Sequence, residues 1–148
     1  MSIEWTYKTW EKLTKEELYQ ILYLRSKVFV VEQNCPYLDI DGKDKISNHL
    51  LGYYKKKLIA YARVFLNEDP CIIGRVVVAQ NKRKKNIGKQ TMLQAMEHIP
   101  KHKEIHISAQ EYLKLFYEKL GFTQQGEGYL EDGIPHIPMA CPVRSSGL

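Results

Sequence analysis

The sequence predicts an α/β fold on a mixed sheet, because its hydrophobic residues follow two different periods along the chain. Residues 3–8 alternate apolar and polar side chains, which is the period of a strand, whereas residues 15–29 repeat apolar side chains at helical spacing. Residues 71–80 form a β-branched run with few polar side chains, which is typical of a central strand buried on both faces. Together these segments predict helices layered on a sheet.

The first helix has a clear start signal and is followed by a long loop. Thr14 and Glu17 have the S/T-x-x-E spacing of a capping box, so we expect the helix to cover about 15–29. Residues 34–48 contain Pro, Gly and three Asp and predict an irregular loop, and loops of this length in compact domains are usually functional.

The remaining segments complete an order of β-α-β-β-β-α-β-α-β-β. We expect a hairpin of strands 49–54 and 58–66 around a lysine turn, strand 71–80, a helix that begins within 81–90 and ends at Pro100, strand 104–110, helix 112–122 and a last pair of strands joined at 131–133. Gly121 would supply the left-handed residue that caps the helix over 112–122.

Length and composition limit the architecture and the compartment. The 148 residues fit one domain, which we expect to span 1–148. No stretch approaches the roughly 20 apolar residues of a membrane span, and the N-terminus lacks the apolar core of a signal peptide. Three cysteines without C-x-x-C spacing argue against a disulfide framework and against a zinc site. We therefore expect a cytoplasmic protein with no membrane partner and no metal.

The most pronounced charge feature is a basic loop between the strand over 71–80 and the next helix. Five basic residues with no acid among them equal the whole net charge of +5: Lys82, Arg83, Lys84, Lys85 and Lys89. The free N–H groups of a helix N-terminus favour an anion, and Gly88 lets a phosphate approach the backbone closely. The Walker pattern and the G-x-G-x-x-G fingerprint are both absent. We predict a phosphate site here.

Two alternatives compete with the phosphate site. Runs of basic residues are often solvated surface, and residues 82–89 also suit a nucleic-acid-binding module whose affinity would fall steeply with salt. Residues 81–91 contain no aromatic side chain on which a base could stack, so we expect no nucleic-acid partner.

Several motifs resemble those of one acyltransferase superfamily. Residues 83–88, Arg-Lys-Lys-Asn-Ile-Gly, resemble the R/Q-x-x-G-x-G/A pyrophosphate loop of the GNAT superfamily, and FYEKLGF at 116–122 resembles its second signature. Longer segments resemble the ElaA-like branch of that superfamily: VFVVEQNCPYLDIDG at 28–42, YAR at 61–63, IGRVVV at 73–78, AQ at 109–110 and EDGIPH at 131–136. The resemblance spans about residues 3–143, which is nearly the whole chain.

This resemblance implies a GNAT-type acyltransferase fold, in which a mixed, mostly antiparallel sheet has a splayed central strand and helices on both faces. It implies acetyl-CoA as co-substrate and a primary amine of a small molecule or peptide as acceptor; a homodimer stays open. The residues expected to contact coenzyme A are Val76, Val77, Val78, Arg83, Lys84, Lys85, Asn86, Ile87, Gly88, Lys89, Gln90, Gln110 and Tyr117.

Two of these positions depart from the family pattern. Asn86 stands where the family loop has its first glycine, and asparagine tolerates a left-handed backbone better than most residues. Gln110 stands where many relatives have Asn, but it keeps an amide for the pantetheine arm.

The fold implies that an amine attacks the thioester of acetyl-CoA. A lysine-like amine has a pKa of about 10.4, so a base must take a proton. N–H donors near Val77 and Val78, where the sheet splays, would stabilise the oxyanion. Tyr117 is the candidate acid for the departing thiolate. The strand over 71–80 has no carboxylate, although several relatives carry a general-base Glu there.

The general base therefore stays open among water and four side chains: Glu32, His49, Asp132 and His136. We expect Glu32 and His136 to line the acceptor pocket, and Glu32 follows an apolar run that could raise its pKa by burial. A structural contact of His49 with the long loop is at least as well supported as a catalytic role.

The long loop adds two further expectations and one rival function. Cys35 is expected to be a small buried residue rather than a nucleophile. The acids Asp39, Asp41 and Asp44 lack the EF-hand spacing, and we expect them to attract a cationic amine acceptor. Residues 24–33 are also similar to the start of acyl-homoserine-lactone synthases, so acyl transfer of that kind is an alternative.

Overall fold

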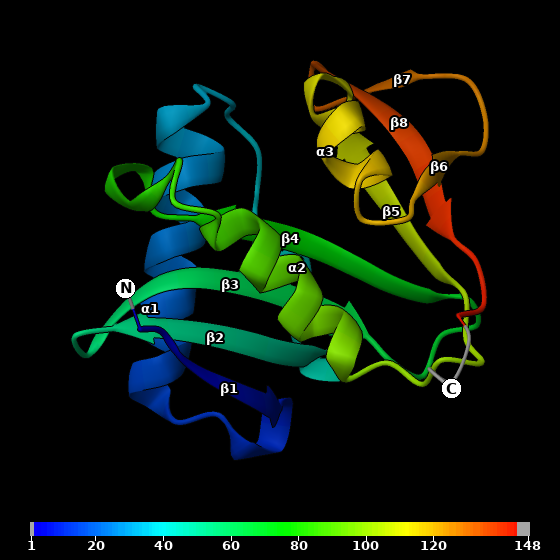
Figure 1. Ribbon diagram of the computed structural model, residues 1–148. Coiled ribbons are helices and arrows are strands. Elements are labelled where there is room, and N and C mark those ends of the chain that lie inside the picture. Colours follow the sequence, from blue (N-terminus) through cyan, green and yellow to red (C-terminus); the bar gives the residue numbers. More distant parts are fainter. Residues whose placement is uncertain (1, 145–148) are drawn as a thin grey trace.

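The computed structural model describes residues 2–144, which form one mixed sheet with helices on both of its faces (Figure 1). The elements are β1 (Glu4–Thr9), α1 (Lys15–Arg25), β2 (Asn48–Tyr54), β3 (Lys57–Phe65), β4 (Cys71–Val78), α2 (Ile87–Glu97), β5 (Ile105–Gln110), α3 (Lys114–Glu118), β6 (Thr123–Gln124), β7 (Tyr129–Glu131) and β8 (Ile134–Cys141). The predicted element order is confirmed, with the two-residue β6 as an addition.

The sheet is antiparallel except at its centre. Its order is β1-β2-β3-β4-β5-β8-β6, with β7 also paired to β8, and only β4 and β5 run parallel. Lys55 and Lys56 form the tight turn between β2 and β3, both with positive φ, as a two-residue hairpin turn requires. The expectation of a mixed, mostly antiparallel sheet is therefore confirmed.

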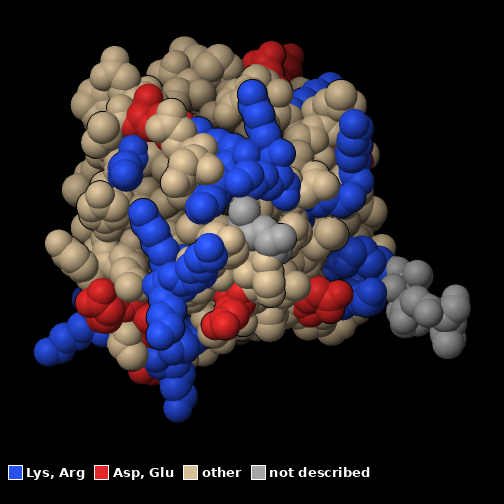
Figure 2. Space-filling view, turned by 60° about the vertical axis from the view of Figure 1, so that its left-hand side comes forward, with Lys and Arg blue, Asp and Glu red and all other residues tan. Residues whose placement is uncertain are grey.

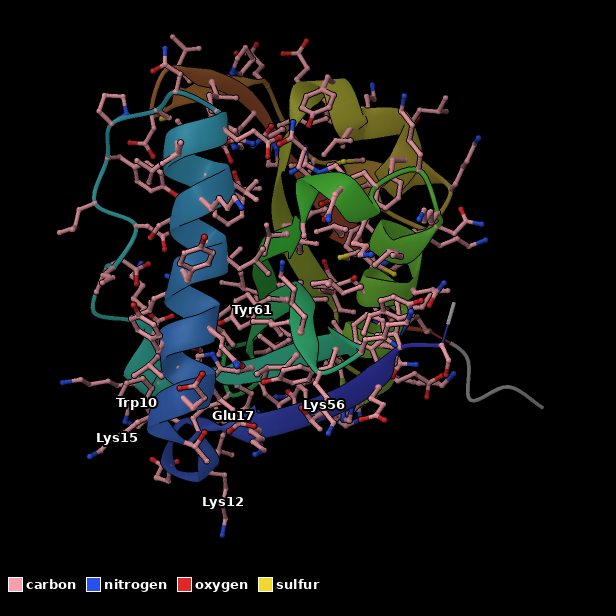
Figure 3. All side chains as sticks on the ribbon, turned by 90° about the vertical axis from the view of Figure 1, so that its left-hand side faces the viewer. Trp10, Lys12, Lys15, Glu17, Lys56 and Tyr61 are labelled. Carbon is pink, nitrogen blue, oxygen red and sulfur yellow. The ribbon has the colours of Figure 1, made fainter. Side chains whose placement is uncertain are left out.

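Neighbouring residues on the strands point into cores on the two opposite faces of the sheet. Leu51, Tyr61 and Val77 pack against α1, through Ile21 and Leu24. On the opposite face, the core that joins α2 and α3 to the sheet includes Leu50, Ala62, Met92, Ala95, Tyr117 and Phe122. Figure 3 looks along the sheet, with α1 on one side and α2 on the other.

The first helix starts as predicted but continues further than expected. Thr14 Oγ1 accepts a hydrogen bond from the Glu17 N–H at 3.0 Å, and the Glu17 carboxylate accepts one from the Thr14 N–H at 2.9 Å, which confirms the capping box. The expected end at residue 29 is wrong, because Ser26–Glu32 continue the helix as a π-helix. Bonds such as Gln33 N–H to Val28 O span five residues and carry the chain to the sheet centre.

Two other expectations about the elements are wrong in part. The last helix is α-helical over Lys114–Glu118 only, because residues 111–113 form a 3-10 turn and Gly121, at φ +99°, ends it. β4 is not buried along its whole length, because Ile72 is 36% exposed. Beyond Ile72, where the pairing with β5 ends, the strand faces a cavity. Within residues 2–144, no helix has both the length and the apolar character to cross a membrane.

Candidate active site

β4 and β5 separate after two residue pairs, and a cavity of about 540 Å³ opens between them. The two strands pair only at Cys71–Ile105 and Ile72–His106. On its other flank β4 stays paired with β3 as far as Val78. Among the strands of residues 2–144, none pairs with the β5-facing flank of β4 beyond Ile72, as expected for a splayed central strand (Figure 1). A cavity of this volume is in the range of small-ligand sites.

The start of α2 forms one end of this cavity. Asn86 has φ +61°, so the expectation that asparagine takes a left-handed backbone here is confirmed. The first helical bond of α2 runs from the Gln90 N–H to the Asn86 carbonyl. The N–H groups of residues 87–89 therefore have no partner in the helix, and with the helix dipole they favour an anion.

The basic residues of the loop before α2 take different positions. Lys84 and Lys89 line the cavity together with Asn86 and Gly88. Lys82 lies over the Tyr54 ring, 4.9 Å from its centre, and Lys85 is exposed outside the cavity lining. Ile87 and Gln90 both lie outside the cavity lining. The Ile87 side chain is buried in the core, so only its backbone N–H at the start of α2 could contact a ligand.

The surface around this loop is strongly basic. Lys55 and Lys82 both lie over the ring of Tyr54, which brings the lysine turn of β2 and β3 next to the loop before α2. Figure 2 shows the corresponding face, on which lysine and arginine side chains gather with few acids between them.

Arg83 and Glu32 form an ion pair at the cavity. The Arg83 guanidinium donates two hydrogen bonds to the Glu32 carboxylate, and its Nε donates one to the Val78 carbonyl at 3.2 Å. Glu32 lines the cavity but is exposed, so the expected burial of its carboxylate is wrong. The π-helix carries Glu32 past the apolar run to the cavity rim, where it meets Arg83.

The β4 valines and Gln110 lie on the two sides of the splay. Val76, Val77 and Val78 all line the cavity, and the Val77 side chain is buried in the core under α1. Gln110, at the end of β5, also lines the cavity, with its Nε2 3.4 Å from the Gln33 Oε1. Within the described part of the chain, a long hydrogen bond is the one contact that holds its amide.

Tyr117 reaches the cavity from α3. It is 8% exposed and packs edge-on against the rings of Phe116 and Phe122. Burial raises the pKa of Tyr117 to about 12, so its hydroxyl keeps the proton at neutral pH. This hydroxyl makes no hydrogen bond to any group in residues 2–144, although it lies in the wall of a ligand-sized cavity.

His136 and Asp132 come from the β7–β8 hairpin, and both line the cavity. His136 is 7% exposed, and its Nδ1 lies 2.7 Å from the Ile134 carbonyl. Because a carbonyl oxygen can only accept, Nδ1 is the donor of that contact, and in the neutral ring the lone pair is on Nε2. Nε2 lies 3.5 Å from a Glu131 oxygen. His136 is therefore a histidine of the cavity that can accept a proton.

His49 lies outside the cavity lining. It is fully buried, with Nδ1 2.6 Å from the Tyr61 hydroxyl and Nε2 2.9 Å from the Asp44 carbonyl. Burial lowers its pKa, which keeps the ring neutral. The structural alternative for His49 fits these contacts, and a base role does not.

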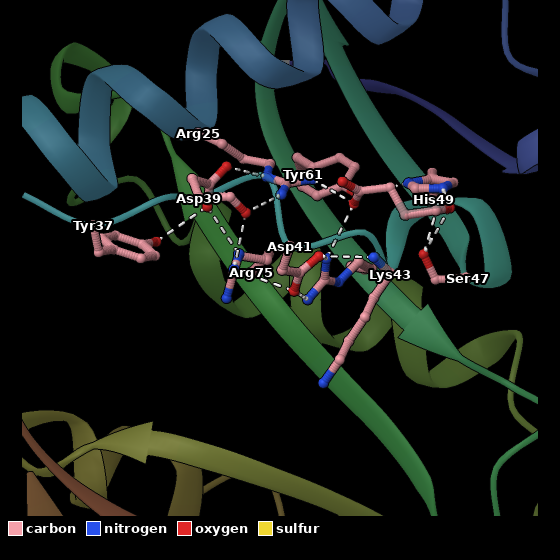
Figure 4. Close-up of polar contacts among 11 residues, drawn as sticks. Arg25, Tyr37, Asp39, Asp41, Lys43, Ser47, His49, Tyr61 and Arg75 are labelled. Atoms are coloured by element: carbon pink, nitrogen blue, oxygen red, sulfur yellow. Dashed lines mark hydrogen bonds and ion pairs between the residues drawn. The ribbon is translucent and has the colours of Figure 1, made fainter. Parts of the chain in front are cut away.

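The three acids of the long loop do not form an open acidic site. Each is ion-paired to arginine, and the network consists of Asp39, Asp41 and Asp44 with Arg25, Arg63 and Arg75 (Figure 4). Three negative charges meet three positive ones, so the expected attraction of a cationic amine by these acids is wrong. Within residues 2–144, no group of acids, histidines or cysteines is arranged to hold a metal ion.

Arg75 is a cavity residue that was not expected from the sequence. The side chain of Arg75 lines the cavity beside Tyr37, with the guanidinium 5.7 Å from the ring centre. The only signal in the sequence is an arginine inside the β-branched run over 71–80. Cys35 is buried as expected, and its thiol lies 3.1 Å from the Asp132 carbonyl at the cavity wall.

Comparisons with known proteins agree with this geometry. The profile of the Acetyltransferase (GNAT) domain family matches residues 12–143. The chain is 44% identical to protein ElaA of Escherichia coli K12, over 95% of this chain and 97% of that protein. The crystal structure of Escherichia coli ElaA superposes with a TM-score of 0.88 and covers 95% of this chain and 99% of that one.

Two further solved structures resemble the chain, one in both sequence and fold and the other in fold alone. An acyl-CoA N-acyltransferase from Pseudomonas aeruginosa is 41% identical, with a TM-score of 0.86 over 93% of this chain and 99% of that one. A CoA-dependent acyl-homoserine lactone synthase, BjaI, has a TM-score of 0.77 over 97% of this chain and 84% of that one, but at 16% identity this likeness concerns the fold alone. With its splayed sheet and its match to the family profile, the chain belongs to the GNAT acetyltransferase family, in the ElaA-like branch.

Proposed function

We propose that this protein transfers an acetyl group from acetyl-CoA to a primary amine. The observation that supports this most is the free flank of β4 beside the anion-favouring start of α2, in one cavity. The amine nitrogen forms a bond to the acetyl carbon and the C–S bond breaks. The sulfur leaves as the thiol of coenzyme A, with a proton that originates on the amine.

The residues at and before the start of α2 would suit the phosphates of coenzyme A. The N–H groups at residues 87–89 and the ammonium groups of Lys84 and Lys89 would hold the pyrophosphate. Gln110 would bind the pantetheine arm through its amide. The N–H groups of β4 near Val77 and Val78 would stabilise the oxyanion, because the β5-facing flank of the strand has no partner there.

His136 would accept the amine proton, and Tyr117 would stabilise the leaving sulfur. We assign His136 as the acceptor of the amine proton, directly or through water, because its Nε2 keeps a lone pair. Tyr117 would donate a hydrogen bond to the leaving sulfur. A thiol has an ordinary pKa of about 8.5, well below that of Tyr117, so the hydroxyl would stabilise the thiolate mainly by this hydrogen bond. Glu32 would line the acceptor side while its carboxylate holds Arg83.

The proposal is tested by thermal unfolding with acetyl-CoA, with CoA and with a short oligonucleotide. A ligand at 100 times its Kd stabilises the folded state by about 2.7 kcal/mol, and we expect this from acetyl-CoA and CoA. Lys89→Glu should abolish most of the shift because its side chain lines the cavity, whereas Lys101→Glu, exposed in the turn after α2, should retain it.

The alternative functions predict other results. Stabilisation by the oligonucleotide and none by acetyl-CoA would support the nucleic-acid module and overturn the enzyme proposal. Release of CoA thiol with S-adenosylmethionine, and not with simple amines, would support acyl transfer of the homoserine-lactone type. We expect acetyl-CoA to be consumed only when an amine is present.

A further inference from the structure

Arg75 occupies an irregular position in the central strand. Arg63 pairs with Gly74 and Tyr61 pairs with Val77, so Ala62 of β3 faces two residues of β4, which is a β-bulge. Arg75 sits in this bulge at φ +50°, a backbone conformation that is rare and strained for a residue with a side chain. Such strain persists where the surrounding structure holds it, and it is frequent at functional sites.

The bulge directs the Arg75 side chain to the α1 side of the sheet. Ile73 and Val76, on either side of the bulge, both pack into the core under α2, although strict alternation would separate them. Arg75 instead reaches the loop over residues 34–46 and lines the cavity beside Tyr37. The acceptor side of the cavity thus contains a guanidinium that a regular strand would not present there.

Asp39 and Asp41 fix the guanidinium from one side. Arg75 Nε lies 2.8 Å from the Asp39 carboxylate, and Nη2 donates to the Asp39 carbonyl at 3.0 Å and to Asp41 at 3.4 Å (Figure 4). Nε is buried and its contact with Asp39 is an ion pair without hydrogen-bond geometry. Nη1 makes no hydrogen bond to any group in residues 2–144, so its two N–H donors remain for a ligand.

The other two arginines of the network are not available in this way. Arg25 is fully buried and Arg63 is 4% exposed, and neither lines the cavity. The Arg75 side chain is 21% exposed and lies in the wall. The three aspartates and the three arginines balance in charge. The member of this network that lines the cavity is the cation Arg75.

We propose that Arg75 binds a carboxylate of the acceptor, so that the acceptor is an amino acid or another small amine that carries a carboxylate. This inference rests on the proposed function and names the class of its second substrate. Guanidinium groups bind carboxylates through charge-assisted hydrogen bonds, and a guanidinium already held in place loses little freedom on binding. Arg75 lies two residues before Val77 on β4. A carboxylate bound to Arg75 would therefore keep the amine of the acceptor close to this part of the strand.

The test compares matched acceptors with the purified full chain. Release of CoA thiol from acetyl-CoA is measured with the L-amino acids, β-alanine and γ-aminobutyrate, with the carboxamide of each, and with spermidine. The best acid should exceed its carboxamide by about tenfold or more in kcat/KM, as expected for one charge-assisted hydrogen bond. Arg75→Gln should reduce this ratio to about twofold by raising the KM of the acid, a change that a purely structural role would not produce.

Two further variants control for damage to the network. Arg75→Lys keeps the charge but loses the fork, so the ratio should fall at least about threefold even if Arg75→Gln folds poorly. Arg63→Lys perturbs Asp41, which also contacts Arg75, from outside the cavity, and the ratio should stay at the wild-type value. The Kd for acetyl-CoA reports whether each variant is folded.

Three results would overturn the assignment of Arg75: an unchanged ratio in both Arg75 variants, acids no better than their carboxamides, or no acetylation of any acid in the panel. Transfer to spermidine or to carboxamides alone would leave the proposed acetyl transfer standing. Failure of acetyl-CoA to bind the wild-type protein would overturn the proposed function itself.

Discussion

The carboxylate of Glu32 accepts two hydrogen bonds from the guanidinium of Arg83, and this pair joins the end of the first helix to the loop before α2. The two residues were expected on different sides of the site, Glu32 toward the acceptor and Arg83 toward the phosphates. Both side chains are partly exposed at the cavity rim. The phosphates of coenzyme A would therefore compete with Glu32 for Arg83.

Glu32→Gln should tighten the binding of CoA. The substitution removes a negative charge near the expected pyrophosphate and frees Arg83, and an exposed ion pair is worth about 0.2–1 kcal/mol, so the Kd should fall about 1.4- to fivefold. Calorimetry at low and high salt measures it, with Glu16→Gln on the exposed face of α1 as control. A Kd raised tenfold would mean instead that the pair holds the loop in its binding conformation.

Tyr117→Phe should lower the turnover number and leave the fold intact. The hydroxyl has no hydrogen-bond partner in residues 2–144, so its removal costs the folded state little, whereas a missing donor to the leaving thiolate should reduce kcat about 100-fold. Tyr112→Phe, at an exposed cavity tyrosine, should change kcat less than about twofold. Wild-type kcat in Tyr117→Phe would remove this residue from the mechanism.

Much of the fold could be predicted because local signals agree with it. The capping box at Thr14 and Glu17, the lysine turn and the left-handed Asn86 all depend on a few neighbouring residues, and all three are present. The π-helix over 26–32 and the short α3 could not be predicted in this way. Both depend on how the helix ends meet the splayed sheet, since the apolar spacing alone fits a regular helix.

In the candidate site, too, the features that depend on neighbouring residues could be predicted, and those that depend on distant residues could not. The loop before α2 could be predicted as an anion site because basic residues, a glycine and a helix start occur within eight residues. The aspartates of the long loop looked like a site for a cation because their partners are distant in sequence, 14 residues away for Arg25–Asp39 and 36 for Arg75–Asp39. A one-residue bulge turns Arg75 toward the cavity, and sequence periodicity cannot locate such an insertion.

The arginine–aspartate network should make the stability of the protein sensitive to acid. Burial alone would raise the pKa of Asp44, but hydrogen bonds and charges from Arg25 and Arg63 outweigh it and lower the pKa. Because the folded pKa lies below the unfolded value of about 3.9, the stabilisation is fully present above roughly pH 5 and is lost as the pH falls through the folded pKa.

Asp44→Asn tests this contribution directly. The variant should lose about 3 kcal/mol in the free energy of unfolding at pH 7, since it leaves buried arginine charge underpaired, and less at pH 3. Urea unfolding from pH 7 to pH 3 gives both values. Glu118→Gln, at an exposed carboxylate of α3, should follow the wild-type curve. Parallel curves for Asp44→Asn and the wild type would exclude Asp44 as a source of acid sensitivity.

Gly52 and Gly74 should respond in opposite ways to alanine. Gly52 of β2 pairs with Trp5 of β1, and a Cβ at Gly52 would lie 2.5 Å from the Trp5 ring, so the ring must move. Gly52→Ala should therefore cost about 1–3 kcal/mol in urea unfolding, as overpacking does. At Gly74 in β4, no atom of residues 2–144 lies within 4 Å of an added Cβ, and Gly74→Ala should be neutral or stabilise by up to about 1 kcal/mol. Equal losses in both variants would show that the flexibility of glycine in strands, rather than the contact with Trp5, determines the effect.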